Sequence, residues 1–256
     1  MPEGELIWII GASEGIGAAL VRHYAAAGAR LVLSARSEDK LNAMLAELDG
    51  KHIAVPLDVS DRASVEAAAR TIAPLGPLAR VVHLAAMYDP GHVRDLDADK
   101  AAQLVATNLM GSFHIAQIAP SLLRQGGQLA LCGSVAGYIG LPKGQIYSAS
   151  KAAVINLTES LRLELAGAVD VRLICPGFVD TRLTRQNDFA MPAMMTPEAA
   201  AGAIARGLNT RRFEVHFPKR LTLGLKLLSA LPYWAALPLL RRFMRAQSTK
   251  NTETIS

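Results

Sequence analysis

Short apolar runs alternate with longer stretches of helical periodicity over the first 217 residues of the chain. Each run has the length and the aliphatic content of a strand that is buried on both faces of a sheet. The runs predict strands at residues 6–10, 30–34, 52–55, 81–84, 128–132, 169–175 and 213–217. Because strands alternate with helices through short joins, we expect an α/β fold with a doubly wound parallel sheet in a single domain.

Helical periodicity fills the intervals between these strands. Ser37 stands in the N-cap position of one predicted helix, and Thr196 followed by Pro197 marks the start of the last helix of this region. Helices are predicted over residues 18–27, 37–48, 61–73 and 146–165, and from Pro197 onward.

A leucine-rich segment follows this region. We divide the chain accordingly into a body, residues 1–217, and a hydrophobic, basic, helical tail, residues 218–256. The apolar stretch 221–240 is long enough to cross a bilayer, but Lys226 and two prolines argue against a membrane span.

The tail has the pattern of an amphipathic helix, with leucines around most of its circumference. The polar positions Thr222, Lys226 and Ser229 fall on one face. Two interpretations fit. An amphipathic segment with aromatic residues at one end and flanking cations such as Arg245 suits the surface of a membrane. A helical pair that packs on the body, or across a dimer contact, explains the same pattern.

Charge is distributed unevenly along the chain. The net charge is +5, but the segment from Arg211 to the C-terminus has nine Lys/Arg and two Asp/Glu. The first 210 residues therefore carry 18 basic and 20 acidic side chains. Because the body is not basic, we expect no nucleic-acid partner.

The hydrophobic share of 51% allows a sizeable core. Cys132 and Cys175 both lie in predicted strands, which favours buried thiols over a disulfide, and no Cys/His cluster has the spacing of a metal site. The N-terminus has no basic region before its first apolar run, so it does not have the pattern of a secretory signal. We expect a cytoplasmic protein without a metal.

A glycine-rich turn connects the first strand to the first helix, with the spacing G-x-x-x-G-x-G. Glycines let backbone N–H groups approach a pyrophosphate, and the N-terminus of the helix favours its negative charge. We expect this turn to bind a dinucleotide through Gly11, Ser13, Glu14, Gly15, Ile16 and Gly17.

The end of the second strand indicates which dinucleotide is bound. An NAD site would place an acidic residue about 20 residues after the glycines, for the ribose 2′-hydroxyl. This chain has Arg36 near that point, which either pairs with a 2′-phosphate or is a solvated arginine at the start of a helix. The first interpretation predicts NADP, and we expect this cofactor. Ala85 and Ala86, after the fourth strand, are small enough for a flat cofactor ring to pass close to the backbone.

A candidate proton-transfer site follows the fifth strand. Ser134 stands at the carboxyl end of that strand, where open α/β sheets bind ligands. Tyr147 and Lys151 are four residues apart and lie on one face of a predicted helix. An ammonium group beside a phenol favours the phenolate, so we expect Lys151 to lower the pKa of Tyr147 and to make it a general acid or base. Asn108, within a helical pattern, indicates either a kink or a bound water, or is a tolerated surface residue.

Taken together, these motifs resemble the short-chain dehydrogenase/reductase family over roughly residues 5–217. The glycine turn is followed, in the family's order and spacing, by Asp58, Asn108, Ser134, Tyr147, Lys151 and Pro176-Gly177. The resemblance implies a Rossmann-like fold. It also implies catalysis by Asn108, Ser134, Tyr147 and Lys151, with Tyr147 exchanging the proton, Ser134 holding the substrate oxygen and Asn108 supporting a water that relays protons to Lys151.

The resemblance also implies further contacts to NADP(H). Asp58 and Val59 are expected near the adenine. Lys151 is expected to bind the nicotinamide ribose, with Tyr147 close to it. The residues expected beside the nicotinamide are Pro176, Gly177, Val179 and Thr181. Two segments depart from the family's pattern. Ile10 replaces its usual threonine, and residues 83–86 read His-Leu-Ala-Ala in place of Asn-Asn-Ala-Gly.

The leading hypothesis is an NADP-dependent carbonyl reductase or alcohol dehydrogenase. A segment rich in methionine, residues 183–195, with Phe189 among its apolar side chains, suits an apolar, lipid-like substrate, although packing explains it equally. One alternative is reduction of 3-oxoacyl thioesters. Another is a redox-silent dinucleotide-binding or membrane-docked module, which would not need the four catalytic residues together. The family implies a homo-oligomer.

Overall fold

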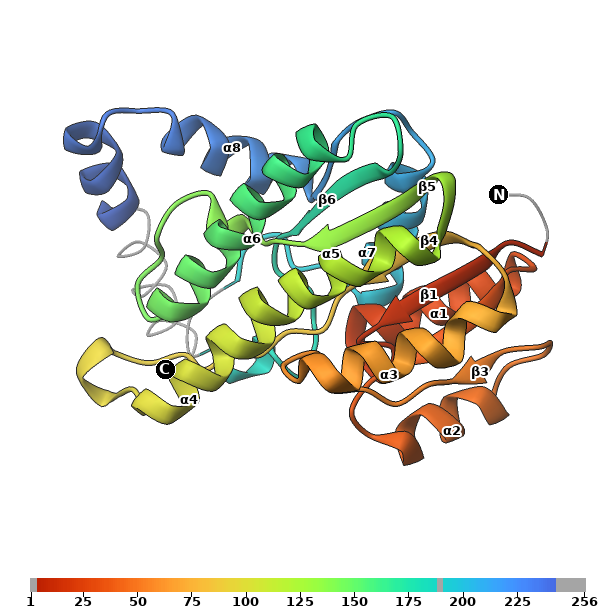
Figure 1. Ribbon diagram of the computed structural model, residues 1–256. Helices are drawn as coiled ribbons and strands as arrows, with labels where there is room; N and C mark the ends of the chain where they lie inside the picture. The colour runs from red at the N-terminus through yellow and green to blue at the C-terminus, as the bar shows by residue number, and fades with distance from the viewer. Residues whose placement is uncertain (1–3, 188–190, 243–256) are drawn as a thin grey trace.

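The computed structural model describes residues 4–187 and 191–242, so Phe189 and Arg245 lie outside the described residues. A seven-stranded, wholly parallel sheet runs through the molecule in the order β3-β2-β1-β4-β5-β6-β7, with helices on both faces (Figure 1). The strands are β1 (Leu6–Ile10), β2 (Arg30–Ser34), β3 (Ile53–Ala54), β4 (Leu78–His83), β5 (Leu123–Cys132), β6 (Asp170–Pro176) and β7 (Glu214–Phe217). The predicted doubly wound α/β fold is confirmed.

The helices cover the sheet in two layers. Those that contribute to the core on one face are α1 (Gly15–Ala26), α2 (Glu38–Ala46) and α7 (Pro197–Leu208). Those on the opposite face are α3 (Arg62–Ile72), α5 (Gly111–Leu122) and α6 (Gln145–Glu164). Two more helices, α4 (Ala98–Val105) and α8 (Lys219–Ser229), lie outside these layers. The predicted N-caps are present, because Ser37 accepts from the backbone of Lys40 and Thr196 from that of Ala199.

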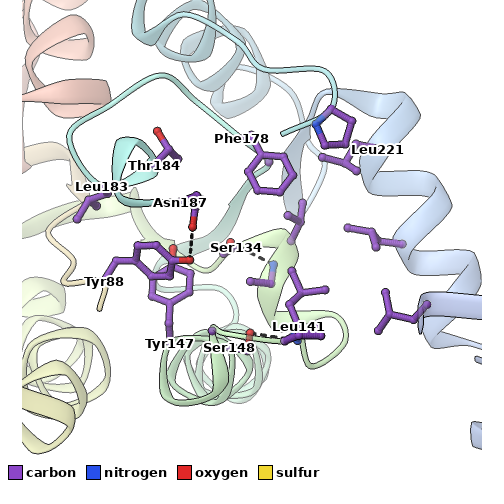
Figure 2. A pocket seen from close by; sticks show the side chains of 18 residues that line it. Tyr88, Ser134, Leu141, Tyr147, Ser148, Phe178, Leu183, Thr184, Asn187 and Leu221 are labelled. Carbon is purple, nitrogen blue, oxygen red and sulfur yellow. Dashed lines mark hydrogen bonds between the residues drawn. The ribbon is translucent and has the colours of Figure 1, made fainter. Parts of the chain in front are cut away.

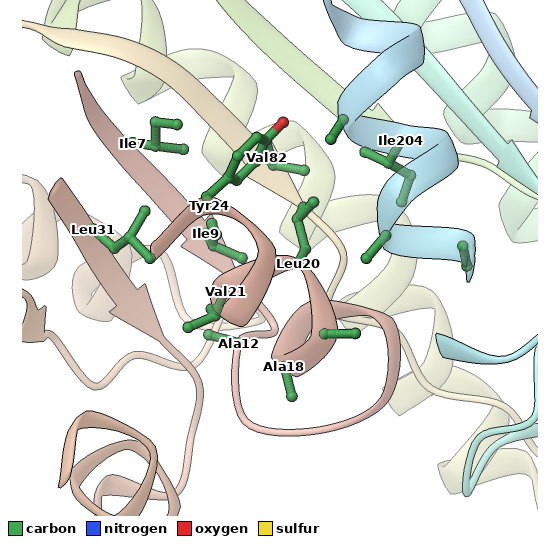
Figure 3. Close-up of a cluster of buried hydrophobic side chains, with 14 of the residues drawn as sticks. Ile7, Ile9, Ala12, Ala18, Leu20, Val21, Tyr24, Leu31, Val82 and Ile204 are labelled. Carbon is green, nitrogen blue, oxygen red and sulfur yellow. The ribbon is translucent and has the colours of Figure 1, made fainter. Parts of the chain in front are cut away.

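The first strand shows why the apolar runs are continuous. Ile7 and Ile9 pack on the α1 and α7 side, where Leu20 and Ile204 meet them (Figure 3). Trp8 and Ile10 alternate to the α3 and α5 side. All five residues of β1 are buried, so no position on the strand is left for a polar side chain.

Helix α4 continues into α5 through a π-helical turn, Ala106–Met110. Asn108 lies in the middle of this turn and is almost completely buried. Its side chain forms hydrogen bonds with the backbone of Met87 and with the hydroxyl of Ser150, so the alternative of a tolerated surface residue is wrong. Turns of this type often mark functional sites within helices.

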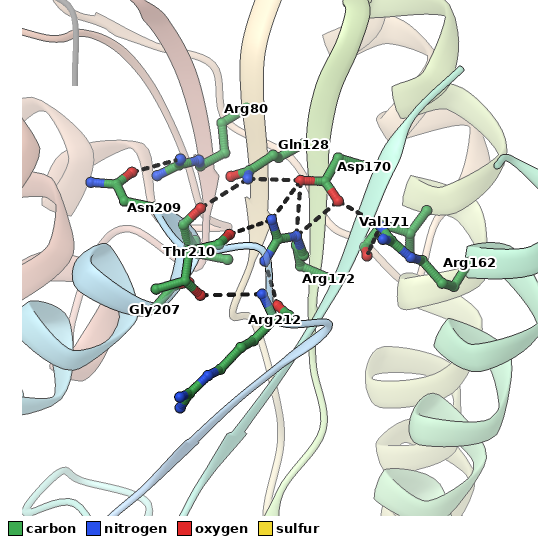
Figure 4. A network of polar contacts seen from close by, with 11 residues as sticks. Arg80, Gln128, Arg162, Asp170, Val171, Arg172, Gly207, Asn209, Thr210 and Arg212 are labelled. Carbon is green, nitrogen blue, oxygen red and sulfur yellow. Dashed lines mark hydrogen bonds and ion pairs between the residues drawn. The ribbon is translucent and has the colours of Figure 1, made fainter. Parts of the chain in front are cut away.

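A polar network anchors the sheet at the end away from the glycine turn (Figure 4). Arg172 is 4% exposed, and its Nε lies 2.8 Å from a carboxylate oxygen of Asp170. The same guanidinium donates to the carbonyl of Thr210, just beyond α7, at 2.5 Å. Gln128 donates to the carbonyl of Leu208 at 2.9 Å. Carbonyls that the end of α7 leaves without helical partners are thus satisfied by β5 and β6.

The tail packs against the last strand. Helix α8 begins directly after β7 and is followed by a second helical stretch, residues 233–242 (Figure 1). Among the described residues, no helix combines the length and the apolar character that crossing a membrane requires.

Candidate active site

The glycine turn lies between β1 and α1, at the carboxyl edge of the sheet. Gly11 has a φ of +86°, and a Cβ placed there would lie 2.6 Å from the backbone nitrogen of Ala85. A Cβ at Gly17 would lie 1.9 Å from the carbonyl oxygen of Gly11. Both positions therefore require glycine, because a side chain at Gly11 would collide with the β4 loop and one at Gly17 would collide with the backbone of the turn itself. The turn presents backbone, rather than side chains, to a ligand at the start of α1.

A cavity of about 540 Å³ extends from this turn along the ends of β2, β3 and β4. Most of the predicted cofactor-binding residues line it: Gly11, Ser13, Glu14, Gly15, Ile16, Gly17, Arg36, Asp58, Val59, Ala85, Ala86 and Thr181. The cavity fits a phosphorylated dinucleotide for three reasons: its glycine turn has no room for a Cβ, a helix N-terminus faces it, and one end is basic.

The basic end of the cavity contains more charge than the sequence indicated. Lys40 on α2 lines it together with Arg36 and Ser37. The Lys40 ammonium lies 3.4 Å from a carboxylate oxygen of Glu14, whose other oxygen is 2.7 Å from Arg182. The hydrogen bond from Arg182 lowers the pKa of Glu14. Two cations, Lys40 and Arg182, therefore pair with the carboxylate of Glu14, and Arg36 lines the same end of the cavity.

Asp58 holds the turn after β3. Its Oδ1 accepts from the backbone of Ser60 at 2.9 Å and from the hydroxyl of the same residue at 2.7 Å. Its backbone nitrogen donates to Ser64. The carboxylate therefore has a fixed orientation at the rim of the cavity.

A second, largely apolar pocket adjoins the first, and Ser134 and Tyr147 lie in its wall (Figure 2). Figure 2 shows Tyr88 beside Tyr147, with Phe178 and Leu221 across the space from them. Apolar side chains from four separate parts of the chain complete the lining: Val135, Leu141, Pro142, Leu183, Leu225 and Leu240. Two of these, with Leu221, come from the tail.

Lys151 is buried behind this wall. Its Nζ donates to the carbonyl of Cys132 at 2.7 Å and lies 5.8 Å from the centre of the Tyr147 ring. Burial lowers the pKa of Lys151. The amide nitrogen of Asn108 donates to the hydroxyl of Ser150 on α6 at 3.1 Å, and its oxygen accepts from the backbone of Met87 at 2.7 Å. Asn108 thereby ties the β4 loop to the helix that carries Tyr147.

The expected lowering of the Tyr147 pKa is wrong for this structure. Burial raises that pKa, and the hydrogen bond with Ser134 opposes the rise only in part. The ammonium group of Lys151 does not offset the burial, because it points toward the Cys132 carbonyl. The phenol is therefore protonated at neutral pH and is suited to donate a proton.

Comparison with known proteins identifies the family. The model of the short chain dehydrogenase family matches residues 5–191. This chain belongs to the short-chain dehydrogenase/reductase family. It is therefore an oxidoreductase of that family, and the resemblance seen in the motifs is confirmed.

Three individual proteins illustrate what this chain is similar to. Ketoacyl reductase HetN of Nostoc is 29% identical over 224 residues, covering 83% of this chain and 78% of the relative. An alcohol dehydrogenase of Thermococcus sibiricus, solved with 5-hydroxy-NADP, superimposes with a TM-score of 0.77 at 27% identity over 84% of this chain and 96% of its own. A Burkholderia phymatum protein solved with NAD has a TM-score of 0.79 at 24% identity, covering 88% and 92%, which shows the fold alone.

Some predicted cofactor contacts of the short-chain dehydrogenase/reductase motif lie elsewhere. Gly177 and Tyr147 line the apolar pocket rather than the dinucleotide cavity. Pro176 and Val179 are buried and line neither space. Lys151 and Asn108 are likewise buried between elements.

The sequence interpretation missed several residues of the site. Lys40 is one α-helical turn after Ser37, so the N-cap could have indicated that it faces the same cavity as Arg36. Tyr88 and Asn187 gave no local signal, because each lies in an irregular loop. The other residues that line the dinucleotide cavity and were not predicted to do so are Ile10, Ala35, Ser37, Leu57, Leu84, Met87, Thr107, Cys132, Arg182 and Leu183.

Proposed function

We propose that this protein is an NADP(H)-dependent oxidoreductase that transfers a hydride between the nicotinamide and a carbonyl or secondary alcohol on an apolar, lipid-like substrate. The observation that carries the proposal is the position of Tyr147 and Ser134 in the wall of an apolar pocket that adjoins the dinucleotide cavity. The cofactor supplies the hydride when bound. The protein supplies orientation, a dry site and the proton.

The roles of the catalytic residues follow from their positions. Tyr147 is held protonated by burial, so in the reducing direction it delivers its proton to the developing alkoxide. Ser134 donates a second hydrogen bond to the same oxygen. Lys151, buried beside Cys132, returns a proton to Tyr147. Asn108, fixed by its hydrogen bonds with Met87 and Ser150, supports a water that relays protons from solvent to Lys151.

The preference for NADP is supported by the cations at the end of β2. Arg36 and Lys40 line the cavity where a 2′-phosphate would lie, and Glu14 is already paired with Arg182. The Thermococcus sibiricus relative was solved with an NADP derivative, which agrees with this assignment.

A second candidate is the reduction of 3-oxoacyl thioesters. It is supported by the similarity to a ketoacyl reductase. It is also supported by Lys219 and Arg220, which are exposed at the start of α8, directly before the pocket residue Leu221. Such cations would suit an acidic acyl carrier.

We further propose that the enzyme acts in the cytoplasm as a homo-oligomer, with body and tail as its two parts.

Ketone reduction by purified protein tests the proposal. We expect NADPH consumption with medium- and long-chain apolar ketones, and a loss of at least about a thousandfold in Tyr147→Phe. NADPH binding should persist in this variant, since the hydroxyl is remote from the glycine turn. Tyr233→Phe, at an exposed tyrosine that lines neither cavity, is the matched control. Equal turnover by Tyr147→Phe and the wild type would refute the mechanism.

A further inference from the structure

The amphipathic helix α8 turns its polar side toward the protein. Thr222 is completely buried, and its hydroxyl lies 2.6 Å from Nδ1 of His216 on β7. Lys226 forms an ion pair with Glu214, which also accepts a hydrogen bond from the hydroxyl of Tyr138. Two of the three polar residues, Thr222 and Lys226, are therefore used to fix α8 to β7 and to the loop after Ser134, whereas Ser229 is exposed.

The opposite side of the tail presents apolar side chains to the exterior. Tyr233 is 81% exposed and Trp234 is 80% exposed. Four more large apolar side chains of the tail are exposed, and we call the whole set the tail face: Leu223, Leu227, Tyr233, Trp234, Leu237 and Leu239. Large apolar side chains gathered in this way on a folded protein mark an interaction surface.

Within the tail, cations flank the tail face in the sequence, and residues 215–242 contain no acidic side chain. The same range contains five Lys/Arg. Lys226 is used internally, and the other four are exposed: Lys219 and Arg220 before the face, and Arg241 and Arg242 after it. Leucine and paired aromatic side chains between cationic flanks match an anionic lipid bilayer, in which the aromatic rings lie at the headgroup level.

We propose that the tail face docks this enzyme on the surface of an anionic lipid bilayer. A second copy of the chain fits this face less well than a bilayer does. In a twofold-symmetric dimer the tail face of one protomer would pack against the tail face of the other. Such a contact would bring four exposed cations from each protomer together with no carboxylate on either face to pair with them. A bilayer instead buries the leucines and aromatic rings while its phosphates pair with the cations.

Docking through this face would place the substrate pocket next to the lipid. Leu221, Leu225 and Leu240 line the pocket from the inner side of the same tail whose outer side carries Leu223 and Trp234. A lipid-like ketone would thus pass from the bilayer to Tyr147 around a single helix. This second step rests on the proposed function, whereas docking itself does not.

Binding of the full-length chain to vesicles tests the proposal without any turnover. The chain has two tryptophans, and Trp8 is completely buried in the sheet, so a change in emission on addition of vesicles reports on Trp234. We expect co-sedimentation and a blue shift with vesicles of phosphatidylcholine and phosphatidylglycerol. Weaker binding is expected to phosphatidylcholine alone and at high salt.

Two variants and a control separate the contributions. Tyr233→Ser with Trp234→Ser should reduce sedimentation about tenfold, because two exposed rings no longer enter the lipid. Arg241→Glu with Arg242→Glu should remove the preference for phosphatidylglycerol. Leu163→Ser, at a leucine on α6 that is 81% exposed, should bind as the wild type does.

Two results would overturn the proposal. One is a wild-type chain that stays in the supernatant with both kinds of vesicle. The other is a wild-type chain that does not bind vesicles but forms an oligomer that becomes smaller in the variant Tyr233→Ser with Trp234→Ser. That result would show that the tail face binds a second copy of the chain. If the wild-type chain binds vesicles but reduces no ketone, the proposed function is refuted and the docking proposal stands.

Discussion

The ring of Tyr88 stands edge-on to the ring of Tyr147, with the ring centres 4.8 Å apart and the planes at 72°. The hydroxyl of Tyr88 donates to the side-chain oxygen of Asn187 at 2.5 Å. Tyr88 belongs to the loop after β4 and Asn187 to the loop after β6, so the pair bridges the pocket above the proton donor (Figure 2). The ring of Tyr88 thus sets both the orientation of Tyr147 and the width of the pocket.

Replacement of Tyr88 should therefore affect selectivity and turnover together. We expect Tyr88→Ala to lower kcat/KM for small ketones about 3- to 10-fold, because an aromatic pair contributes about 0.5–1.5 kcal/mol. Bulkier ketones should lose less, since the pocket widens. Tyr88→Phe keeps the ring and loses the Asn187 hydrogen bond, and it should retain most of the activity. A larger loss in Tyr88→Phe than in Tyr88→Ala would show that the hydroxyl, rather than the ring, is the important group.

Reversal of charge at the end of β2 should change the cofactor. We expect Arg36→Asp to weaken NADPH binding by at least about tenfold and to improve NADH binding, because a carboxylate repels a 2′-phosphate and accepts from a ribose hydroxyl. Lys40→Ala should weaken NADPH binding less. Fluorescence titration with both nucleotides measures these changes. Lys51→Asp makes the same change of charge at an exposed turn and should leave the preference intact; an unchanged preference in Arg36→Asp would refute the assignment.

His83 should make the protein sensitive to acid. This side chain is completely buried, neither ring nitrogen has a hydrogen-bond partner among the described residues, and burial, aided by the charge of Lys151, lowers its pKa to about 3. Between about pH 6.5 and pH 3 the unfolded chain therefore binds a proton that the folded chain does not. As the pH decreases from about 6.5 to about 3, the free energy of unfolding should decrease by up to about 1.4 kcal/mol per pH unit because of this one group.

Urea denaturation across this pH range tests the role of His83. The variant His83→Asn removes the titrating group, so its stability should depend less steeply on pH between 6 and 4 than that of the wild type. The difference in slope should correspond to the uptake of up to about one proton on unfolding. His92→Asn, at an exposed loop position, should follow the wild-type slope. An unchanged slope in His83→Asn would mean that other groups dominate acid unfolding.

Arg172 should be important for stability but not for chemistry. We expect Arg172→Met to reduce the free energy of unfolding by about 3 kcal/mol, because it leaves Asp170 and the carbonyls beyond α7 without their buried partner. The site lies at the opposite end of the sheet, so kcat should not change. Arg62→Met removes an exposed pair with Glu66 and should cost no more than about 0.5 kcal/mol.

The elements of the body could be predicted because their signals are local. The apolar run of β2 has the bounds that were expected, and the N-cap and proline at Thr196 and Pro197 locate the start of α7. The third strand is shorter than its sequence indicated, because only Ile53 and Ala54 pair with β2 at the edge of the sheet.

The chemistry of the site was harder to predict than its composition. Spacing places Tyr147 and Lys151 on one face of α6, but it does not show that Lys151 points to the Cys132 carbonyl or that burial raises the Tyr147 pKa. Both depend on side chains from other strands. The same holds for α8, where the polar face could be found from the sequence but its inward direction depends on Glu214 and His216.

Leu221, Leu225 and Leu240 make the tail part of the pocket, and this affects how the enzyme can be shortened or recombined. A shortened form that ends before residue 219 would keep the whole dinucleotide cavity and lose one wall of the substrate site. Water would then reach Tyr147, and such a form would bind nucleotide normally while appearing inactive or indiscriminate. Conversely, exchange of tails between related enzymes should transfer substrate preference without any change in the catalytic residues.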